Sequence, residues 1–189
     1  VAPLYRADAK EALAQAGFRV SDIAVPAGEG SKSVEVAGEI WEAMASLALG
    51  RDCVVVALGG GVVGDLAGFV AATYMRGVPF IQLPTSLLAQ VDSSVGGKVA
   101  VNHALGKNLI GAFYQPQAVF MDLAFMQSLP KREIYTGLGE IIKYGIIYDR
   151  EFFEFLERNQ QSVLALEPEA ATHMIARSCE IKAEVVSQD

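Results

Sequence analysis

Several residue types are scarce in this sequence of 189 residues, and each scarcity excludes a class of protein. There are only two cysteines, Cys53 in an apolar run and Cys179 in a helix-like stretch, so we expect core thiols and no disulfide framework. The sequence has no run of eighteen apolar residues and no charged-then-apolar leader, so we expect neither a membrane partner nor a signal peptide. A cytoplasmic location is the simplest expectation.

Positive charge is also in short supply. Lysine and arginine total 15 against 22 acidic residues, which gives a net charge of −7. Nothing here would form a broad basic face, so we expect no nucleic-acid partner, and any bound anion must be met by local cations. The two histidines, His103 and His173, do not have metal-ligand spacing, and His173 is expected on a helix surface.

Hydrophobic residues make up 52% of the chain, enough for one good core and a second small domain. Their spacing predicts helices over residues 4–17, 31–49 and 65–75 and strands over residues 18–28, 51–58, 78–83 and 117–122. Strands that alternate with helices predict an α/β fold with a Rossmann-like parallel sheet. Only helices are predicted after Pro130, so we expect an α/β domain at 1–130 and the start of an all-α domain at 131–189.

A glycine turn, "VVVALGGGVVGDLAG", follows a buried strand and opens a helix. Gly59, Gly61 and Gly64 have the G-x-G-x-x-G spacing that lets a pyrophosphate approach backbone N–H groups, although a tight structural turn is the alternative. The next strand ends with Gln82 and lacks the acidic residue of a standard Rossmann dehydrogenase, which disfavours that class but not dinucleotide binding. Asp65 is either a helix-start carboxylate or a cofactor contact.

A polar run, "LPTSLLAQVDSSVGGKVAVNHALGKN", follows the strand at 78–83. Thr85 and Ser86 lie where open α/β sheets bind ligands, or they cap the helix that follows. Lys98 and Lys107 each follow a glycine, and two such lysines form a plausible phosphate site. Each lysine alone is more typical of a surface, but Asp92 and the other polar residues of this short span favour a site.

The helix "REIYTGLGEIIKYGII" places Glu140 and Lys143 on a polar stripe with Glu133, Thr136 and Tyr144. One interpretation is a solvated i,i+3 pair. However, the glycines at 137, 139 and 145 each cost this helix about 1 kcal/mol relative to alanine. They therefore indicate close backbone approach, with Glu140 facing a cleft as a metal ligand or an acid/base group.

Three motifs in this order, "GGGVVGDLAGFVAATYMRG", "LPTSLLAQVDSSVGGKVAVNHALGKNLIGAFYQP" and "GEIIKYGI", resemble the 3-dehydroquinate synthase family. The likeness runs from about Gly28 to the end of the chain. It implies a homodimeric lyase, dependent on NAD and on zinc or cobalt. Such an enzyme would convert a phosphorylated sugar acid, 3-deoxy-D-arabino-heptulosonate 7-phosphate, to 3-dehydroquinate and phosphate in the shikimate pathway of aromatic amino acid biosynthesis.

The resemblance also implies roles for individual residues. Glu140 would be a metal ligand. Substrate contacts would be Asp92, Lys98, Asn108 and Lys143, with Arg76 approaching the substrate phosphate of a neighbouring subunit. Cofactor contacts would be Gly28, Glu29, Gly30, Ser31, Lys32, Gly61, Val62, Val63, Gly64, Asp65, Thr85, Ser86, Lys98, Lys107, Phe125, Met126, Gln127 and Ser128.

The ends of the chain show no start or stop signal. By resemblance, the first strand of the cofactor domain precedes Val1 and two histidine metal ligands follow Asp189. We therefore expect these 189 residues to be inactive alone, because one carboxylate does not hold a catalytic zinc. The alternatives are another NAD- and metal-dependent sugar-phosphate cyclase, a polyol dehydrogenase, or a non-catalytic nucleotide-binding domain.

Overall fold

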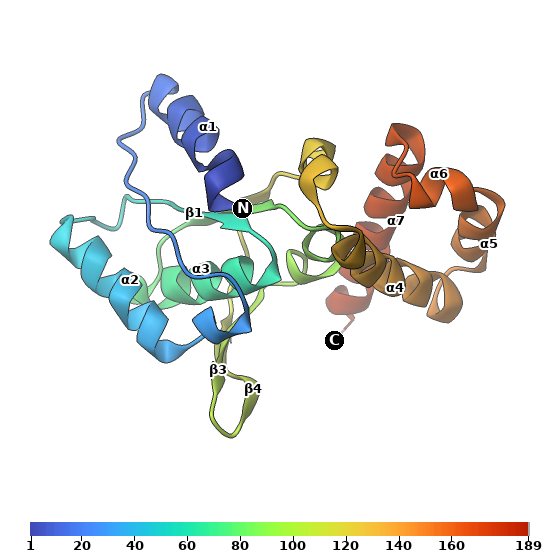
Figure 1. Ribbon diagram of the computed structural model, residues 1–189. Coiled ribbons are helices and arrows are strands. Elements are labelled where there is room, and N and C mark those ends of the chain that lie inside the picture. Colours follow the sequence, from blue (N-terminus) through green and yellow to red (C-terminus); the bar gives the residue numbers. More distant parts are fainter. Residues whose placement is uncertain (189) are drawn as a thin grey trace.

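The computed structural model describes residues 1–188, with a small sheet and its helices followed by a purely helical part (Figure 1). The predicted mixture of strands and helices up to residue 130, and of helices alone after it, is confirmed. Asp189, the predicted end of the second domain, lies outside the described residues. The first part contains α1 (Ala2–Gln15), α2 (Val34–Ser46), β1 (Val55–Gly59), α3 (Gly61–Thr73), β2 (Phe80–Pro84) and β5 (Ala118–Val119).

The main sheet is parallel, with strand order β1-β2-β5, as the continuous apolar strands predict. Val55 lies opposite Phe80 and Gly59 opposite Pro84, so β1 and β2 end side by side. Helix α3 packs on this sheet with Leu66 and Phe69 buried, and Gly68 lets the helix approach Phe80 of β2 as well as the neighbouring residue Val99.

An antiparallel hairpin, β3 (Lys98–His103) and β4 (Gly106–Phe113), projects from the first part of the molecule (Figure 1). It is absent from the predicted elements, because glycines and polar residues interrupt the alternation expected of strands. Val99 and Val101 of β3 are buried in the first core, whereas most of β4 is exposed.

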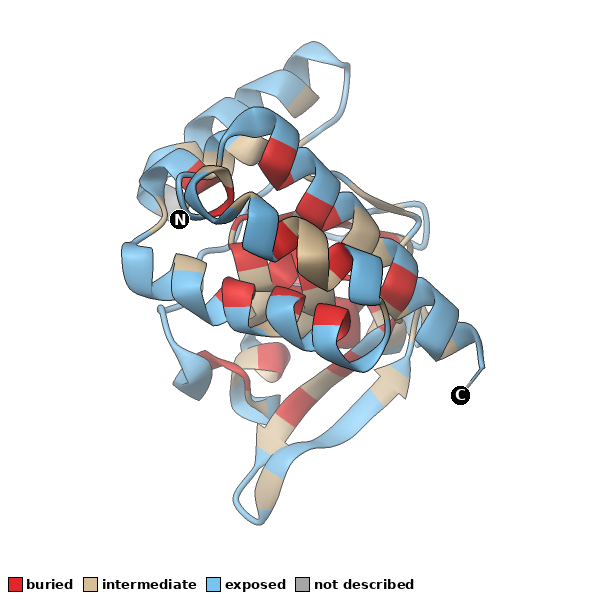
Figure 2. Cartoon of the chain, turned by 90° about the vertical axis from the view of Figure 1, so that its right-hand side faces the viewer, coloured by how far each residue is buried: buried red, intermediate tan, exposed pale blue. Residues whose placement is uncertain are grey.

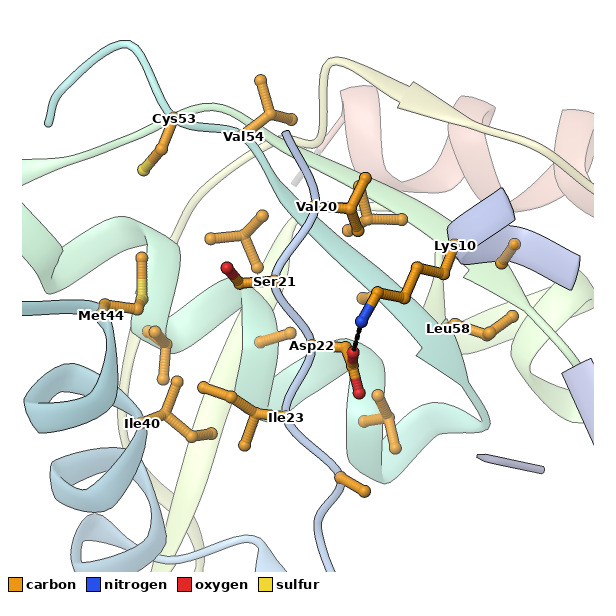
Figure 3. Close-up of a pocket in the computed structure, with 18 of the residues that line it drawn as sticks. Lys10, Val20, Ser21, Asp22, Ile23, Ile40, Met44, Cys53, Val54 and Leu58 are labelled. Carbon is orange, nitrogen blue, oxygen red and sulfur yellow. Dashed lines mark hydrogen bonds and ion pairs between the residues drawn. The ribbon is translucent and has the colours of Figure 1, made fainter. Parts of the chain in front are cut away.

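The strand predicted over residues 18–28 is wrong. These residues form no strand and lead into a short 3-10 helix, η1 (Glu29–Ser31). Their backbone runs along an apolar cavity (Figure 3), and no strand of the described residues pairs with it.

The helical part contains η4 (Leu123–Ser128), α4 (Lys131–Ile147), α5 (Arg150–Arg158), α6 (Gln160–Leu164) and α7 (Pro168–Ser187). Figure 2 shows buried residues interspersed with exposed ones along these helices. None of the helices in residues 1–188 is long and apolar enough to cross a membrane.

Two hydrophobic clusters form the core. The first joins α2, α3, β2 and β3, and the second joins the helices after residue 130. Leu87, Val91 and Met126 precede residue 130 but belong to the second cluster, so the domain boundary near 130 stays a prediction. Cys53 and Cys179 are free and half-buried against the first and second clusters respectively.

Candidate functional site

The glycine turn and the polar run face each other where β1 and β2 end. The Thr85 N–H donates to the Gly59 carbonyl at 2.9 Å. A Cβ placed on Gly61 would lie 2.9 Å from Ser93 Oγ, and one on Gly60 would lie 3.4 Å from Ser86 Oγ. Helix α3 begins at Gly61, so its positive N-terminal end points to the same place.

The hydroxyl groups of Thr85 and Ser86 have different roles. Ser86 Oγ accepts the Ala89 N–H at 3.3 Å, which confirms the capping alternative for Ser86. Thr85 is 4% exposed, and its Oγ1 has no hydrogen-bond partner among the described residues. A buried hydroxyl without a partner is uncommon, so Thr85 Oγ1 has the capacity to hydrogen-bond to a bound molecule.

Lys32 joins three elements around Asp65. Its side chain is buried, and Nζ forms an ion pair with Asp65 on α3 and donates to Asn108 Oδ1 on β4 at 2.6 Å. Burial raises the pKa of Asp65 despite the hydrogen bond from Lys32. The Asn108 N–H donates to Asn102 Oδ1 at 3.0 Å, and Asn102 Nδ2 donates to Glu29 Oε1 at 2.8 Å. The first loop, α3 and the hairpin are therefore tied together by predicted site residues.

Asp92 lies in a π-helical turn, η3 (Ala89–Ser93), between two donors from the helical part. Its Oδ1 accepts hydrogen bonds from Tyr144 Oη at 2.8 Å and from Lys182 Nζ at 2.7 Å. Burial alone would raise the pKa of Asp92, but the hydrogen bonds from Lys182 and Tyr144 hold it below its usual value. Burial and Asp92 also raise the pKa of Tyr144.

Lys182 is a site residue that the sequence reasoning misses. It lies in α7, 90 residues after Asp92, and forms an ion pair with that carboxylate. Nothing in the run "EIKAEVV" distinguishes it from an ordinary surface lysine of an amphipathic helix. Only the packing of α7 against η3 reveals the contact.

Glu140 and Lys143 form the expected i,i+3 ion pair on α4, with 31% and 46% of their side chains exposed. The predicted stripe is only partly solvated, because Tyr144 is buried against η3. Among the described residues no group of three histidine, cysteine, aspartate or glutamate side chains could hold a metal ion.

The glycines of α4 confirm two of three predicted close approaches. A Cβ on Gly137 would lie 2.6 Å from Leu87 Cγ, and one on Gly145 would lie 3.0 Å from the Phe153 Cα. The prediction is wrong for Gly139, because nothing lies within 4 Å of its added Cβ. Gly137 thus brings α4 against the segment that carries Ser86 and Asp92.

Three basic residues of the predicted site lie on the surface: Arg76, Lys98 and Lys107. Lys98 and Lys107 are exposed at the beginnings of β3 and β4. Arg76 is exposed just beyond α3, whose 13 residues separate it by about 20 Å from the glycine turn. Met75, Arg76 and Gly77 all have positive φ, at 48°, 68° and 118°.

Residues 125–128 lie in η4 and differ in exposure. Phe125 packs edge-to-face against Tyr5 with ring centroids 4.8 Å apart, and Ser128 hydrogen-bonds to the Tyr5 hydroxyl. The Met126 side chain is buried in the second cluster, so only its backbone is available to a cofactor.

A cavity of about 250 Å³ lies away from these residues (Figure 3). It is lined mainly by apolar side chains of α1, α2, α3, β1 and residues 20–25, and Lys10 and Asp22 in its lining form an ion pair at 2.7 Å. Of the predicted site residues, only Val63 contacts it. Most of the predicted site residues therefore lie outside this cavity.

Comparisons with known proteins match nearly the whole chain. The family model of the 3-dehydroquinate synthase N-terminal part matches residues 22–136, and that of the C-terminal part matches residues 137–189. A 3-dehydroquinate synthase from Desulforamulus reducens is 59% identical over the full chain, which covers 53% of that relative. The chain spans about half the length of the curated relatives it matches.

Two solved structures are also similar. A 2-epi-5-epi-valiolone synthase from Streptomyces hygroscopicus, solved with NAD⁺ and Zn²⁺, is 30% identical with a TM-score of 0.91, and the match covers 97% of this chain and 52% of that one. A 2-deoxy-scyllo-inosose synthase, complexed with carbaglucose-6-phosphate, NAD⁺ and Co²⁺, has the same identity and TM-score over 99% and 51% of the two chains. Sequence and fold agree, and the chain belongs to the 3-dehydroquinate synthase family.

Proposed function

We propose that this chain forms the cofactor half and the beginning of the metal half of a 3-dehydroquinate synthase. The reaction would convert 3-deoxy-D-arabino-heptulosonate 7-phosphate to 3-dehydroquinate and phosphate. The observation that carries the proposal is the Asp92 carboxylate, fixed by Tyr144 and Lys182 in the segment that faces the glycine turn. The 59% identity to a named 3-dehydroquinate synthase supports this reaction over others of the same fold.

The residues around the glycine turn fit a dinucleotide. Gly60 and Gly61 leave space beside Ser86 and Ser93, the α3 N-terminus favours a pyrophosphate, and Thr85 Oγ1 is buried without a partner. Lys32 and Asp65 close one side of this space through their ion pair. NAD⁺ held by these residues would supply reversible hydride transfer at a carbon that bears a substrate hydroxyl, so that no net NADH forms.

The substrate would lie between the turn and helices α4 and α7. Lys143 and Lys182 near Asp92, with Lys98, would supply local positive charge to a phosphorylated acid in a chain of net charge −7. Asp92 would accept hydrogen bonds from substrate hydroxyls, and Asn108 would donate from its side-chain amide. Lys182 joins the predicted set because it shares the Asp92 carboxylate.

The metal part of the proposal rests on Glu140 alone within the described residues. Catalytic zinc sites normally have three protein ligands, and no such group occurs in residues 1–188. The donor set present does not hold a metal by itself, so we derive no chemical step through one. Glu140 is a candidate for one ligand because its carboxylate is partly exposed one helical turn from Tyr144.

Homodimer formation would give Arg76 its role. Its position, about 20 Å along α3 from the glycine turn, suits a contact with a partner subunit's substrate better than with its own. Sedimentation should give a mass of twice the 20.2 kDa of one chain. A monomer at all concentrations would contradict this part of the proposal.

Two free cysteines support a cytoplasmic location.

Another sugar-phosphate cyclase is the second candidate, favoured by the TM-score of 0.91 to two such enzymes. Calorimetric titration in the presence of NAD⁺ tests the two against each other. The heptulosonate phosphate should bind, whereas carbaglucose-6-phosphate should bind at least tenfold more weakly. The reverse order would replace the synthase by the second candidate.

Turnover tests the reaction class. A protein that contains these residues and has the full length of the curated relatives should release phosphate from the heptulosonate phosphate without accumulating NADH. Residues 1–189 alone should release none. A polyol dehydrogenase would instead accumulate NADH with glycerol, and a non-catalytic domain would bind NAD⁺ without turnover of either compound.

A further inference from the structure

The turn that carries Asp92 is itself unusual. Residues Ala89–Ser93 form a π-helix, a rare conformation that occurs mostly as single turns at functional sites. Such a turn needs support from its surroundings, because its backbone is less favourable than that of an α-helix. Its buried residues Gln90 and Val91 are held within the fold, whereas Asp92 is partly exposed.

Tyr144 supports this turn from α4. Its hydroxyl donates to Asp92 Oδ1 at 2.8 Å and lies 3.4 Å from the Val91 carbonyl oxygen of the same turn. The ring is 4% exposed and packs in the second hydrophobic cluster, so the hydroxyl has little freedom to move. Lys182 also binds Oδ1, which leaves Oδ2 unused by both donors.

We propose that Tyr144 is a positioning residue that fixes the π-helical turn and the Asp92 carboxylate, with Oδ2 presented to the ligand. Tyr144 does not itself contact substrate in this arrangement. The identity of the ligand rests on the proposed function, whereas the effect of Tyr144 on Asp92 does not.

Asp92 is surrounded by charged groups from each element packed against η3. A change in its titration must be judged against all of them, so the test alters one hydroxyl and leaves every formal charge in place. These groups are Asp65 on α3, Lys143 and Tyr144 on α4, and Cys179 and Lys182 on α7.

The test compares Tyr144→Phe with a matched control, Tyr148→Phe. Tyr148 lies four residues after Tyr144, directly after the end of α4. It donates to another carboxylate, Glu184 Oε2, at 2.9 Å. Carbon-13 NMR of labelled aspartate carboxyls would follow the titration of Asp92 in both variants. The pKa of Asp92 should rise in Tyr144→Phe and stay unchanged in Tyr148→Phe, because only the first removes a donor to the ionised form.

Ligand binding gives the second readout. With NAD⁺ present, Tyr144→Phe should weaken binding of the heptulosonate phosphate about tenfold, with NAD⁺ affinity unchanged. If the wild-type chain does not bind this compound, the proposed function fails, and the positioning role is judged from the Asp92 titration alone. Superimposable Asp92 titration curves in the wild type and Tyr144→Phe would overturn the positioning role.

A measurement on the unaltered chain covers the case in which Tyr144→Phe does not fold. The ring carbon that bears the Tyr144 hydroxyl, observed with carbon-13 tyrosine, should change its chemical shift as Asp92 is protonated. The Tyr148 signal provides the comparison. A Tyr144 signal that does not respond to Asp92 protonation would also overturn the proposal.

Discussion

The glycine turn shows at single-residue scale how an absent side chain provides space. An added Cβ at Gly61 lies 2.9 Å from Ser93 Oγ, which can rotate away, and 3.4 Å from Ser93 Cβ, which is ordinary contact, so the fold should tolerate Gly61→Ala. The methyl group and the displaced hydroxyl would then occupy the space proposed for the cofactor.

We predict that Gly61→Ala weakens NAD⁺ binding roughly tenfold, or about 1.4 kcal/mol, with little change in melting temperature. Calorimetric titration with NAD⁺ and a thermal scan measure both quantities. Gly38→Ala on α2, where nothing lies within 4 Å of the added Cβ, is the control and should bind normally. Equal affinities for the two variants would exclude the turn as the cofactor site.

Asp149 links the first turn of α5 to α7. It accepts the Phe152 N–H at 3.0 Å and an Arg177 Nε–H at 2.7 Å. The backbone hydrogen bond and Arg177 hold the pKa of Asp149 below its usual value. A lowered folded-state pKa means stability that is present above the unfolded pKa, about 3.9, and is lost as pH falls through the folded value.

We therefore predict that Asp149→Asn, which keeps a capping oxygen, lowers the unfolding free energy at pH 7 by about 0.5 kcal/mol. The difference from the wild type should shrink at pH 3, where the carboxylate of the wild type is being protonated. Urea unfolding at the two pH values measures it. Asp8→Asn is the exposed control, and an Asp149→Asn defect that is independent of pH would contradict the ionic explanation.

At residue scale, the sequence indicated the chemistry of the candidate site better than it indicated the contacts between the site residues. Spacing and composition indicated the glycine turn, Asp92 and Glu140, because these residues stand in local motifs. They could not indicate Lys182 or the partner of Lys32, because each contact joins residues far apart in the chain. Such pairs depend on packing that single-sequence periodicity does not contain.

Helix α4 shows at element scale that glycines with the same propensity cost have different roles. An added Cβ at Gly137 would meet Leu87 Cγ at 2.6 Å and the Leu88 backbone nitrogen at 2.9 Å, whereas Gly139 is exposed and open. Gly137 therefore allows contact with the neighbouring segment. Gly139 has no such role.

We predict opposite signs for two matched substitutions on this helix. Gly139→Ala should raise the unfolding free energy by about 1 kcal/mol through helix propensity. Gly137→Ala should lower it by roughly 1–3 kcal/mol, because the methyl group overpacks against a backbone that cannot move freely. Urea unfolding measures the unfolding free energy of both variants. Stabilisation by Gly137→Ala would show that α4 does not pack tightly against residues 87–88.

The elements predicted well are those whose periodicity is continuous. Strands β1 and β2 lie in continuous apolar runs, and α4 has apolar residues at helical spacing, so these elements were identified from their patterns. The hairpin β3–β4 was not, because its glycines and exposed residues break the alternation. The extended segment at 18–28 has a strand-like composition without a neighbouring strand to complete it.

The two hydrophobic clusters set the behaviour of the whole molecule. Leu87 and Val91 come from the segment between β2 and β3, yet they are buried among α4 and α7. Separating the two parts would expose these side chains to water. The clusters should therefore lose their structure together.

We predict one cooperative unfolding transition. Trp41, the sole tryptophan in the sequence, reports on the first cluster by fluorescence, and the methyl signals of Ile141 and Ile181 report on the second by NMR. Both probes should give the same urea midpoint. Separate midpoints would instead support residues 1–130 as an independently folding domain.

The position of β1 at the edge of its sheet has a practical consequence for handling the protein. In residues 1–188 β1 pairs on one side only, with β2, and the apolar cavity adjoins it. An unpaired strand edge beside apolar side chains is a template for pairing with another chain. Purification at low protein concentration, with light scattering to detect early aggregates, is therefore the appropriate starting condition for every measurement proposed above.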